Sequence, residues 1–331
     1  MNMVRLKNFG ILLCVLILCV SIFSSCKKTA DTDAESSVPA KVSPVIQSEP
    51  ESSSEPAPEE SSQPETTPPP AASSTPSKPK PTTRVMDLTP YKDVLFTIPP
   101  ETIETLPNIK AGWGVGYCPQ GVRPSVSPAV NSLFSAYDAC FIGENEMKVF
   151  LTFDCGYENG QTAKILDTLW QTDVKAVFFC TTPFVRDNPQ LVERMLNEGH
   201  TLGNHSVSHK SFPSLTTEQM ISEILDVDRY VYERYGYKMS YFRFPSGEHS
   251  EKTLAAAKSC GYKSIFWSFA YLDYDVKNQP TVAKAKEMVL TRAHPGAIYL
   301  LHAVSSANAG ALPEIISGLR AQGYTISLLN F

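Results

Sequence analysis

The sequence predicts an α/β protein whose main part is a parallel sheet covered by helices, with about seven strands in an arrangement that favours a barrel. Three observations lead to this prediction and to the division of the chain into parts. An apolar run lies close to the start of the chain, a long Ser-, Pro- and Glu-rich stretch follows it, and strand-like and helix-like segments alternate after Lys148. The sequence therefore predicts an export segment, a disordered linker and one large folded domain.

The N-terminal 25 residues have the features of a signal peptide. Arg5 and Lys7 precede an apolar run, Phe9 to Phe23. At about 15 residues this run is shorter than the roughly 20 that span a membrane comfortably. The stretch Phe23-Ser24-Ser25-Cys26 resembles a bacterial lipobox, which predicts a lipid on Cys26. The alternatives are ordinary cleavage or an uncleaved anchor, and all three place the protein outside the cytoplasm.

Residues 26–84 are predicted to be a disordered tether, because this stretch has hardly any large apolar side chain to bury. A Pro-rich tether of this length has a coil dimension of roughly 40 Å and a longer stretched reach. That reach would let a membrane-anchored domain work inside a thick cell wall. The alternative is a passive spacer.

The remaining stretch, from Val85 to Phe331, is long enough for one domain with a substantial core. The chain has a formal net charge of −5 and no basic cluster, so nucleic acid is not an expected partner. Five cysteines fall in this stretch, at positions 118, 140, 155, 180 and 260. An odd number without paired spacing argues against a disulfide framework and leaves one pair open.

Seven apolar runs after Lys148 are predicted to be strands. They are Val149–Asp154, Ala176–Cys180, Thr201–His205, Tyr241–Pro245, Ser264–Ser268, Ala297–His302 and Tyr324–Leu329. The amphipathic stretches between them are predicted to be helices: Gly160–Gln171, Asn188–Glu198, Thr216–Tyr235, Ser250–Ser259 and Ala309–Gln322. This rhythm is typical of a parallel sheet, open or closed, and seven repeats favour a barrel.

Polar residues lie at or just beyond the C-terminal ends of these predicted strands. They are Asp154, Cys155, His205, Arg243, Pro245, Ser268 and His302. In parallel α/β folds this edge carries the chemistry, because strand ends point side chains into a common mouth. His200 and His294 precede strands instead and are predicted to be structural.

Two histidines four residues apart, His205 and His209, can both face one metal ion. Asp154 ends an apolar strand, where a carboxylate needs a partner, and Arg243 ends another strand where it could be that partner. Together with His302 these groups are the parts needed for metal-assisted hydrolysis with a separate base and acid.

These residues resemble, in order, the motifs of the NodB-type polysaccharide deacetylases, also called carbohydrate esterase family four. The stretches that carry the resemblance are Phe153-Asp154-Cys155-Gly156, the His205/His209 pair, Arg243-Phe244-Pro245-Ser246-Gly247, Trp267-Ser268 with Asp273, and Leu300-Leu301-His302. The resemblance covers residues 148–331 and implies a distorted (β/α) barrel. Residues 85–147 are then expected to be an N-terminal extension packing on the barrel.

Within that family the sequence is most similar to the delta-lactam-biosynthetic de-N-acetylases, which act on muramic acid in peptidoglycan. The stretches concerned are Trp113-Gly114-Val115-Gly116, Tyr157-Glu158-Asn159-Gly160, Glu198-Gly199-His200, Gly203-Asn204-His205-Ser206, and Ala293 to His302. The resemblance implies a peptidoglycan glycan strand as substrate.

The resemblance also implies a role for each matching residue. His205 and His209 would hold a divalent ion, expected to be zinc. Asp154 would be the general base, paired with Arg243, and His302 would be the general acid.

The same resemblance implies roles for residues that surround the base, the acid and the metal ligands. Asp273 would orient His302, and the Ser246 N–H would face the oxyanion. Tyr274 and Leu300 would form the acetyl-methyl pocket. Cys155 stands where a second aspartate usually ligates the metal, so it is either a third ligand, a buried thiol or half of a disulfide with Cys180.

Two other functions stay open from the sequence. The same chemistry could act on N-acetylglucosamine of peptidoglycan or chitin, or on acetyl esters. A non-catalytic glycan-binding lipoprotein is the alternative from a different class, and Cys155 is the residue that motivates it.

Overall fold

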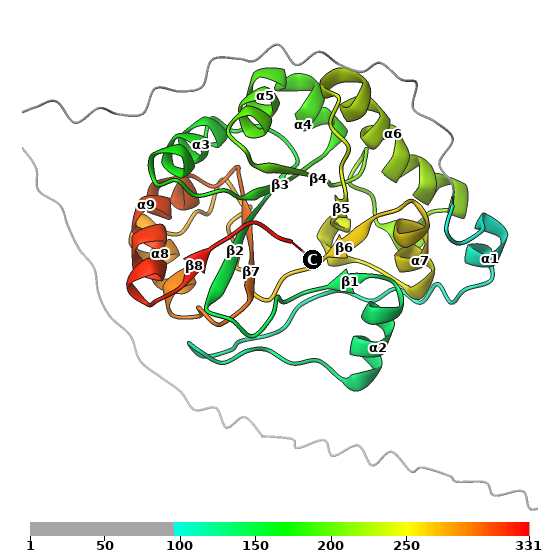
Figure 1. Cartoon of the computed structure of the whole chain (residues 1–331), viewed down its shortest axis with the longest axis horizontal. Coiled ribbons are helices and arrows are strands. Elements are labelled where there is room, and N and C mark those ends of the chain that lie inside the picture. The colour runs from blue at the N-terminus through cyan, green and yellow to red at the C-terminus, as the bar shows by residue number, and fades with distance from the viewer. Residues whose placement is uncertain (1–95, 331) are drawn as a thin grey trace, which may run out of the picture. The chain divides into compact units, whose positions relative to one another are not determined.

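The computed structural model describes residues 96–330, and eight parallel strands in this range form one sheet (Figure 1). The strand order is β1-β6-β5-β4-β3-β2-β7, and β8 pairs with β2. The strands are β1 (Ala139–Cys140), β2 (Lys148–Cys155), β3 (Val177–Cys180), β4 (Thr201–Asn204), β5 (Tyr241–Phe242), β6 (Lys263–Ile265), β7 (Ala297–His302) and β8 (Thr325–Ile326).

The sheet curls because the chain after β6 returns to the far edge strand. Phe269 pairs in parallel with Tyr299 of β7, and Ile142 makes an antiparallel bridge to Ala297 at the start of β7. The predicted distorted barrel is thereby confirmed. All seven predicted strands are present, and β1 adds a further one upstream of Lys148.

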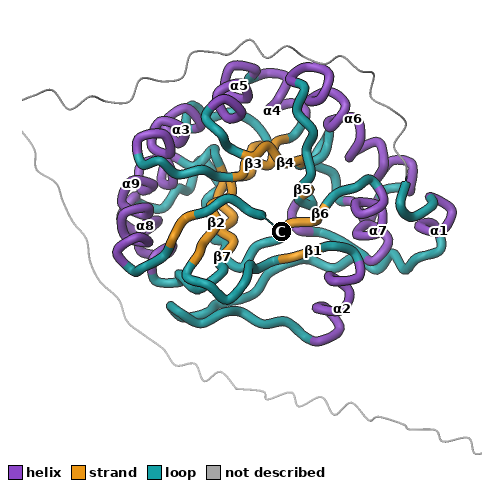
Figure 2. The backbone as a smooth tube through the Cα atoms, viewed as in Figure 1, coloured by secondary structure: helices purple, strands orange, loops and turns teal. Residues whose placement is uncertain are grey.

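Helices surround the sheet and cover its outer face (Figure 2). They are α3 (Thr162–Gln171), α4 (Thr182–Asp187), α5 (Pro189–Asn197), α6 (Thr217–Tyr235), α7 (Glu251–Ser259), α8 (Val282–Leu290) and α9 (Ser306–Ala321). Local sequence sets their ends. The longest, α6, begins at a capping box formed by Thr216 and Gln219 and ends at Gly236, which has a φ of 58°.

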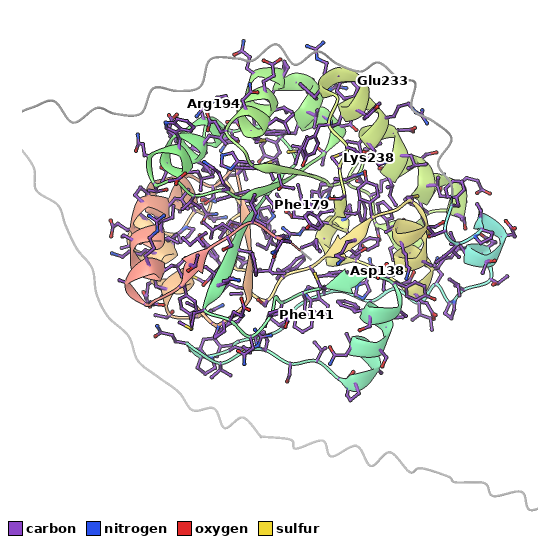
Figure 3. All side chains as sticks on the ribbon, in the orientation of Figure 1. Asp138, Phe141, Phe179, Arg194, Glu233 and Lys238 are labelled. Atoms are coloured by element: carbon purple, nitrogen blue, oxygen red, sulfur yellow. The ribbon has the colours of Figure 1, made fainter. Side chains whose placement is uncertain are left out.

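Strand alternation divides the apolar side chains into two cores. On β2, Phe150 belongs to the core inside the barrel, whereas Leu151, Phe153 and Cys155 belong to the core between sheet and helices. Phe179 of β3 also lies inside the ring of strands (Figure 3). Because successive side chains of a strand point to opposite faces, this pattern places Asp154 on the interior side and Cys155 on the helix side.

The described part of the N-terminal extension, residues 96–147, contains α1 (Pro100–Glu104), α2 (Pro128–Ala136) and β1. Trp113 anchors it to the barrel: its ring centroid lies 5.1 Å from that of Phe266, and its Nε1 donates a 2.9 Å hydrogen bond to the carbonyl oxygen of Trp267.

The predicted signal segment (1–25), Cys26 and the tether (26–84) lie outside the described residues. Among residues 96–330, no helix combines the length and the apolarity that crossing a membrane would require.

Candidate active site

A cavity of about 1020 Å³ opens at the C-terminal ends of the strands. Seven of the residues predicted for the site line it: Asp154, His205, His209, Ser246, Tyr274, Leu300 and His302. The register of the sheet brings two of them together, because Asp154 of β2 and His302 of β7 are direct partners on neighbouring strands. Residues far apart in sequence therefore meet in one site, as the strand-end pattern predicted.

Asp154 forms a buried ion pair with Arg243. Arg243 Nη1 lies 2.7 Å from Asp154 Oδ1, and the same nitrogen donates to the hydroxyl of Thr152 at 2.8 Å. Arg243 Nε donates to the carbonyl oxygen of Ile265 at 3.0 Å. Its guanidinium also lies 4.1 Å from the ring centroid of Phe179, so this fully buried cation is well satisfied.

The ion pair decides the protonation state of Asp154. Burial raises the pKa of this carboxyl, but the charges of Arg243 and of nearby histidines oppose burial and leave the pKa below its ordinary value. Asp154 is therefore ionised at neutral pH, as a general base must be.

The two histidines lie on the loop between β4 and the short 3-10 helix η1 (Phe212–Ser214). Their ring centroids are 4.8 Å apart. Ser206 and His209 have φ values of 70° and 56°, and the backbone N–H of His209 donates to the Ser206 hydroxyl at 2.9 Å. The sequence predicted a strand-to-helix junction here, and a tight turn is what brings the rings together.

His205 has a neutral ring with one nitrogen free of hydrogen bonds to the backbone. Its Nδ1 lies 2.9 Å from the carbonyl oxygen of Arg243, which can only accept, so Nδ1 carries the proton and Nε2 has a free lone pair. Burial lowers the pKa of His205 to about 4, so the ring is neutral. Nε2 lies 3.4 Å from Asp154 Oδ2. Within residues 96–330, no three His, Cys, Asp or Glu side chains are grouped as a complete metal site.

His302 is held by Asp273 from two directions. His302 Nδ1 donates to Asp273 Oδ1 at 2.7 Å, and the backbone N–H of His302 donates to Oδ2 at 2.8 Å. Burial lowers the pKa of His302, but the hydrogen bond and charge of Asp273 outweigh burial and raise it above its ordinary value. The ring therefore holds a proton more strongly than a free histidine does.

The structure adds two residues that the sequence did not identify. Asn308, in the first turn of α9, donates to Asp273 Oδ2 at 2.5 Å and accepts a hydrogen bond from the hydroxyl of Tyr271. Asn308 is almost fully buried, so these bonds fix Asp273 in place. Nothing in the sequence indicated this contact, because Asn308 follows the last predicted strand-end residue by six positions and lies on another element.

The three residues expected to contact the acetyl group differ in how deeply they lie in the cavity. Ser246 lies in the 3-10 helix η2 (Pro245–Gly247) with a φ of 55°, and it faces the cavity. Leu300 is buried inside the barrel. Tyr274 is 54% exposed as a residue, and its ring centroid lies 5.5 Å from that of His302, so it forms the rim of the cavity.

The structure does not bring Cys155 to the cavity. Its side chain is fully buried among the residues between sheet and helices, opposite the face that carries Asp154. Burial and the neighbouring Cys180 raise the pKa of its thiol well above the ordinary value. Both cysteines carry free thiols in this structure. A neutral buried thiol on the helix side is poorly suited to bind a metal ion held by His205 and His209.

Ser268 also lies away from the reacting groups. Its hydroxyl is 2.9 Å from His294 Nε2 and accepts the backbone N–H of Ile298 at 3.0 Å. Ser268 therefore joins the segment after β6 to the start of β7. His200 does not line the cavity either, and its Nδ1 accepts the backbone N–H of Ala176 at 3.2 Å.

Comparison with known proteins places this architecture among characterised enzymes. Residues 143–265 match the family described as polysaccharide deacetylase. The chain is 42% identical over 229 residues to the peptidoglycan-N-acetylmuramic acid deacetylase PdaA of Bacillus subtilis, a match covering 69% of this chain and 87% of that protein. The peptidoglycan-N-acetylglucosamine deacetylase PgdA of Listeria monocytogenes is 34% identical over 177 residues, 54% of this chain and 37% of its own length.

The similarity extends to three dimensions. The solved structure of Bacillus subtilis PdaA, described as a family 4 carbohydrate esterase, matches with a TM-score of 0.66 at 42% identity, over 67% of this chain and 96% of that one. Sequence and fold agree over nearly the whole of that relative, and the chain therefore belongs to the polysaccharide deacetylase family.

Proposed function

We propose that this protein is a metal-dependent hydrolase that removes N-acetyl groups from muramic acid residues of peptidoglycan. The observation that carries the proposal is the pairing of Asp154 with His302 on neighbouring strands, where Arg243 keeps Asp154 ionised and Asp273 raises the pKa of His302 through a hydrogen bond to Nδ1. Amide hydrolysis requires a base and an acid in one cavity, with the pKa of the base lowered and the pKa of the acid raised.

The chain's own residues divide the reaction between them. Asp154 takes a proton from the attacking water, and Arg243 keeps its carboxylate ionised and oriented. His302 delivers a proton to the nitrogen of the leaving amine, with Asp273 stabilising the charged ring. The backbone N–H of Ser246 faces the developing oxyanion, a contribution worth roughly 3 kcal/mol for one such donor. Leu300 and Tyr274 enclose the acetyl methyl group.

The family is generally metal-dependent, and His205 and His209 are the residues that would hold the ion, which we propose to be zinc. When bound there, the ion would supply Lewis-acid polarisation of the acetamide carbonyl and of the water. The neutral ring of His205, with Nδ1 committed to the carbonyl oxygen of Arg243, fits this role. The position of Cys155 on the helix side favours two histidine ligands over a third ligand from the thiol.

The preference for muramic acid is supported by the 42% identity to an enzyme named for that activity. Deacetylation of N-acetylglucosamine in peptidoglycan or chitin is the second candidate, supported by the 34% identity to PgdA. Acetyl esters would be cleaved by the same chemistry.

We further propose that the protein acts outside the cytoplasm, exported by residues 1–25 and tethered to the membrane through a lipid on Cys26. Residues 26–84 would carry the catalytic domain into the wall, where peptidoglycan strands are found. Metabolic labelling with a radioactive fatty acid tests the lipid, and Cys26→Ala abolishes labelling if the proposal is correct.

Mass spectrometry of muropeptides after incubation with the purified protein tests the activity. Loss of acetyl groups from muramic acid is the expected result. Loss from glucosamine alone would establish the second candidate. No loss of acetyl from either sugar, with metal present, would instead favour a non-catalytic glycan-binding protein.

A further inference from the structure

Arg292 is a charged residue of the cavity wall that the proposed chemistry does not use. It lies between α8 and β7, and its guanidinium carbon is 5.1 Å from the ring centroid of Tyr117 and 5.7 Å from that of Phe269. No carboxylate of residues 96–330 forms an ion pair with it, and its side chain makes no hydrogen bond within that range. The two rings support the cation and leave its N–H donors free for a ligand.

The charge balance of the cavity favours an anionic ligand. Asp154 is the sole carboxylate among the residues of the described part that line the cavity, and Arg243 neutralises it. Arg292 therefore adds an uncompensated positive charge. A site lined by one sign of charge concentrates ligands of the opposite sign.

The contacts of Arg292 place its guanidinium away from the acid and base. It lies against Phe269, which pairs with Tyr299 of β7, and His302 is the last residue of that strand. The three strand residues from Tyr299 to His302 span roughly 10 Å. The same cavity is walled by Trp113–Gly116 on one segment and Ala270–Leu272 on another. A polymer in this cavity can therefore place one sugar ring at the acid and base and another at Arg292.

We propose that Arg292 binds the free lactyl carboxylate of a muramic acid residue that lies along the cavity from the one being deacetylated. This inference rests on the proposed function. Muramic acid differs from glucosamine by this lactyl group, whose carboxyl is an anion when no peptide is attached and a neutral amide when a stem peptide is joined to it. A planar guanidinium matches a carboxylate with two parallel hydrogen bonds. Arg292 thus selects peptide-free stretches of glycan.

The test compares wild type, Arg292→Gln and Arg292→Lys on peptide-free glycan strands and on the same strands with their carboxyls converted to neutral amides. On the acidic strands, Arg292→Gln should raise KM about tenfold with kcat nearly unchanged, because uniform binding is lost. Amidation should cost wild type the same factor, and it should leave Arg292→Gln unaffected. Arg292→Lys should recover part of the affinity, since it keeps the charge and loses the paired geometry.

A peptide-free disaccharide with a single muramic acid tests which sugar carries the carboxylate that Arg292 binds. This substrate has a lactyl group only on the reacting sugar and none on a neighbouring one. Wild type and Arg292→Gln should then have equal KM values. A tenfold difference on the disaccharide would mean that Arg292 contacts the reacting sugar, and it would overturn the proposed position. Arg229→Gln, which removes a surface arginine of α6 that pairs with Asp226, is the matched control and should behave as wild type throughout.

The outcomes separate this inference from the proposed function. If wild type releases no acetate from muramic acid in either strand preparation, the proposed function is wrong. If wild type releases acetate and Arg292→Gln retains the wild-type KM on acidic strands, the function stands and the role of Arg292 is refuted.

Discussion

Replacing Asp154 by asparagine tests both the catalytic base and the buried ion pair. The amide keeps the shape of the side chain and removes the charge that lies 2.7 Å from Arg243 Nη1. General-base catalysis contributes about 10²–10⁴-fold to a rate, so turnover should fall by about that factor or more. Arg243 then remains fully buried without a counter-charge.

The loss of the counter-charge should also lower stability. Removing one partner of a buried pair costs about 3–5 kcal/mol. Arg243 keeps its bonds to Thr152 and to the carbonyl oxygen of Ile265, so the lower end of this range is expected. Because domains of ordinary stability unfold with a free energy of about 5–15 kcal/mol, the variant should remain folded with a reduced Tm.

A double variant, Asp154→Asn with Arg243→Met, separates the two effects. It removes the unpaired cation, so it should be more stable than Asp154→Asn alone while remaining inactive. Acetate release and thermal unfolding are measured on the same preparations. Near-normal turnover of Asp154→Asn would remove Asp154 as the base. A double variant no more stable than the single one would refute the argument from the buried charge.

Three further predictions concern the neighbouring groups. His205→Ala should lose bound metal and activity together, whereas Asp154→Asn should lose activity with metal still bound; equal metal content in both variants would contradict the ligand assignment. Asp273→Asn should lower the pKa of His302, so the alkaline limb of the kcat/KM profile should move to lower pH, and an unmoved limb would exclude His302 as the acid. Cys155→Ser should leave metal affinity unchanged under reducing conditions, and a loss far above tenfold would restore the thiol as a ligand.

The sequence predicted most of the fold because its strands are long apolar runs with clear ends. Ala297–His302 was predicted with its observed bounds, and the other strands differ by a few residues at their ends. The elements that were missed carry little signal. β1 has two residues, too few for a periodicity, and α8 buries only Ala285 and Val289.

The candidate site was predictable to the extent that it depends on strand ends. Asp154, His205, Arg243 and His302 all come from that pattern, and parallel pairing brings them to one edge of the sheet. Contacts from other elements were not predictable in this way. Asn308 reaches Asp273 from the first turn of α9, a contact that depends on how α9 packs against the barrel.

For Cys155, the family resemblance and the alternation of side chains along a strand predict different positions. The expectation of a third ligand came from the aspartate that relatives have at that position. Alternation along β2 predicts the opposite face for the residue after Asp154, and the structure follows the alternation.

The proposed mechanism depends on two pKa values that the fold moves in opposite directions. Arg243 lowers the pKa of Asp154, and Asp273 raises the pKa of His302. Above the lowered value the base is ionised, and below the raised value the acid is protonated, so both active forms coexist over the whole interval between them. Asp154 and His302 are partners on neighbouring strands. The base that takes a proton from water and the acid that gives one to the leaving amine can therefore act on the same bound substrate. The two outer partners, Arg243 and Asp273, therefore set the width of the pH range in which the enzyme works.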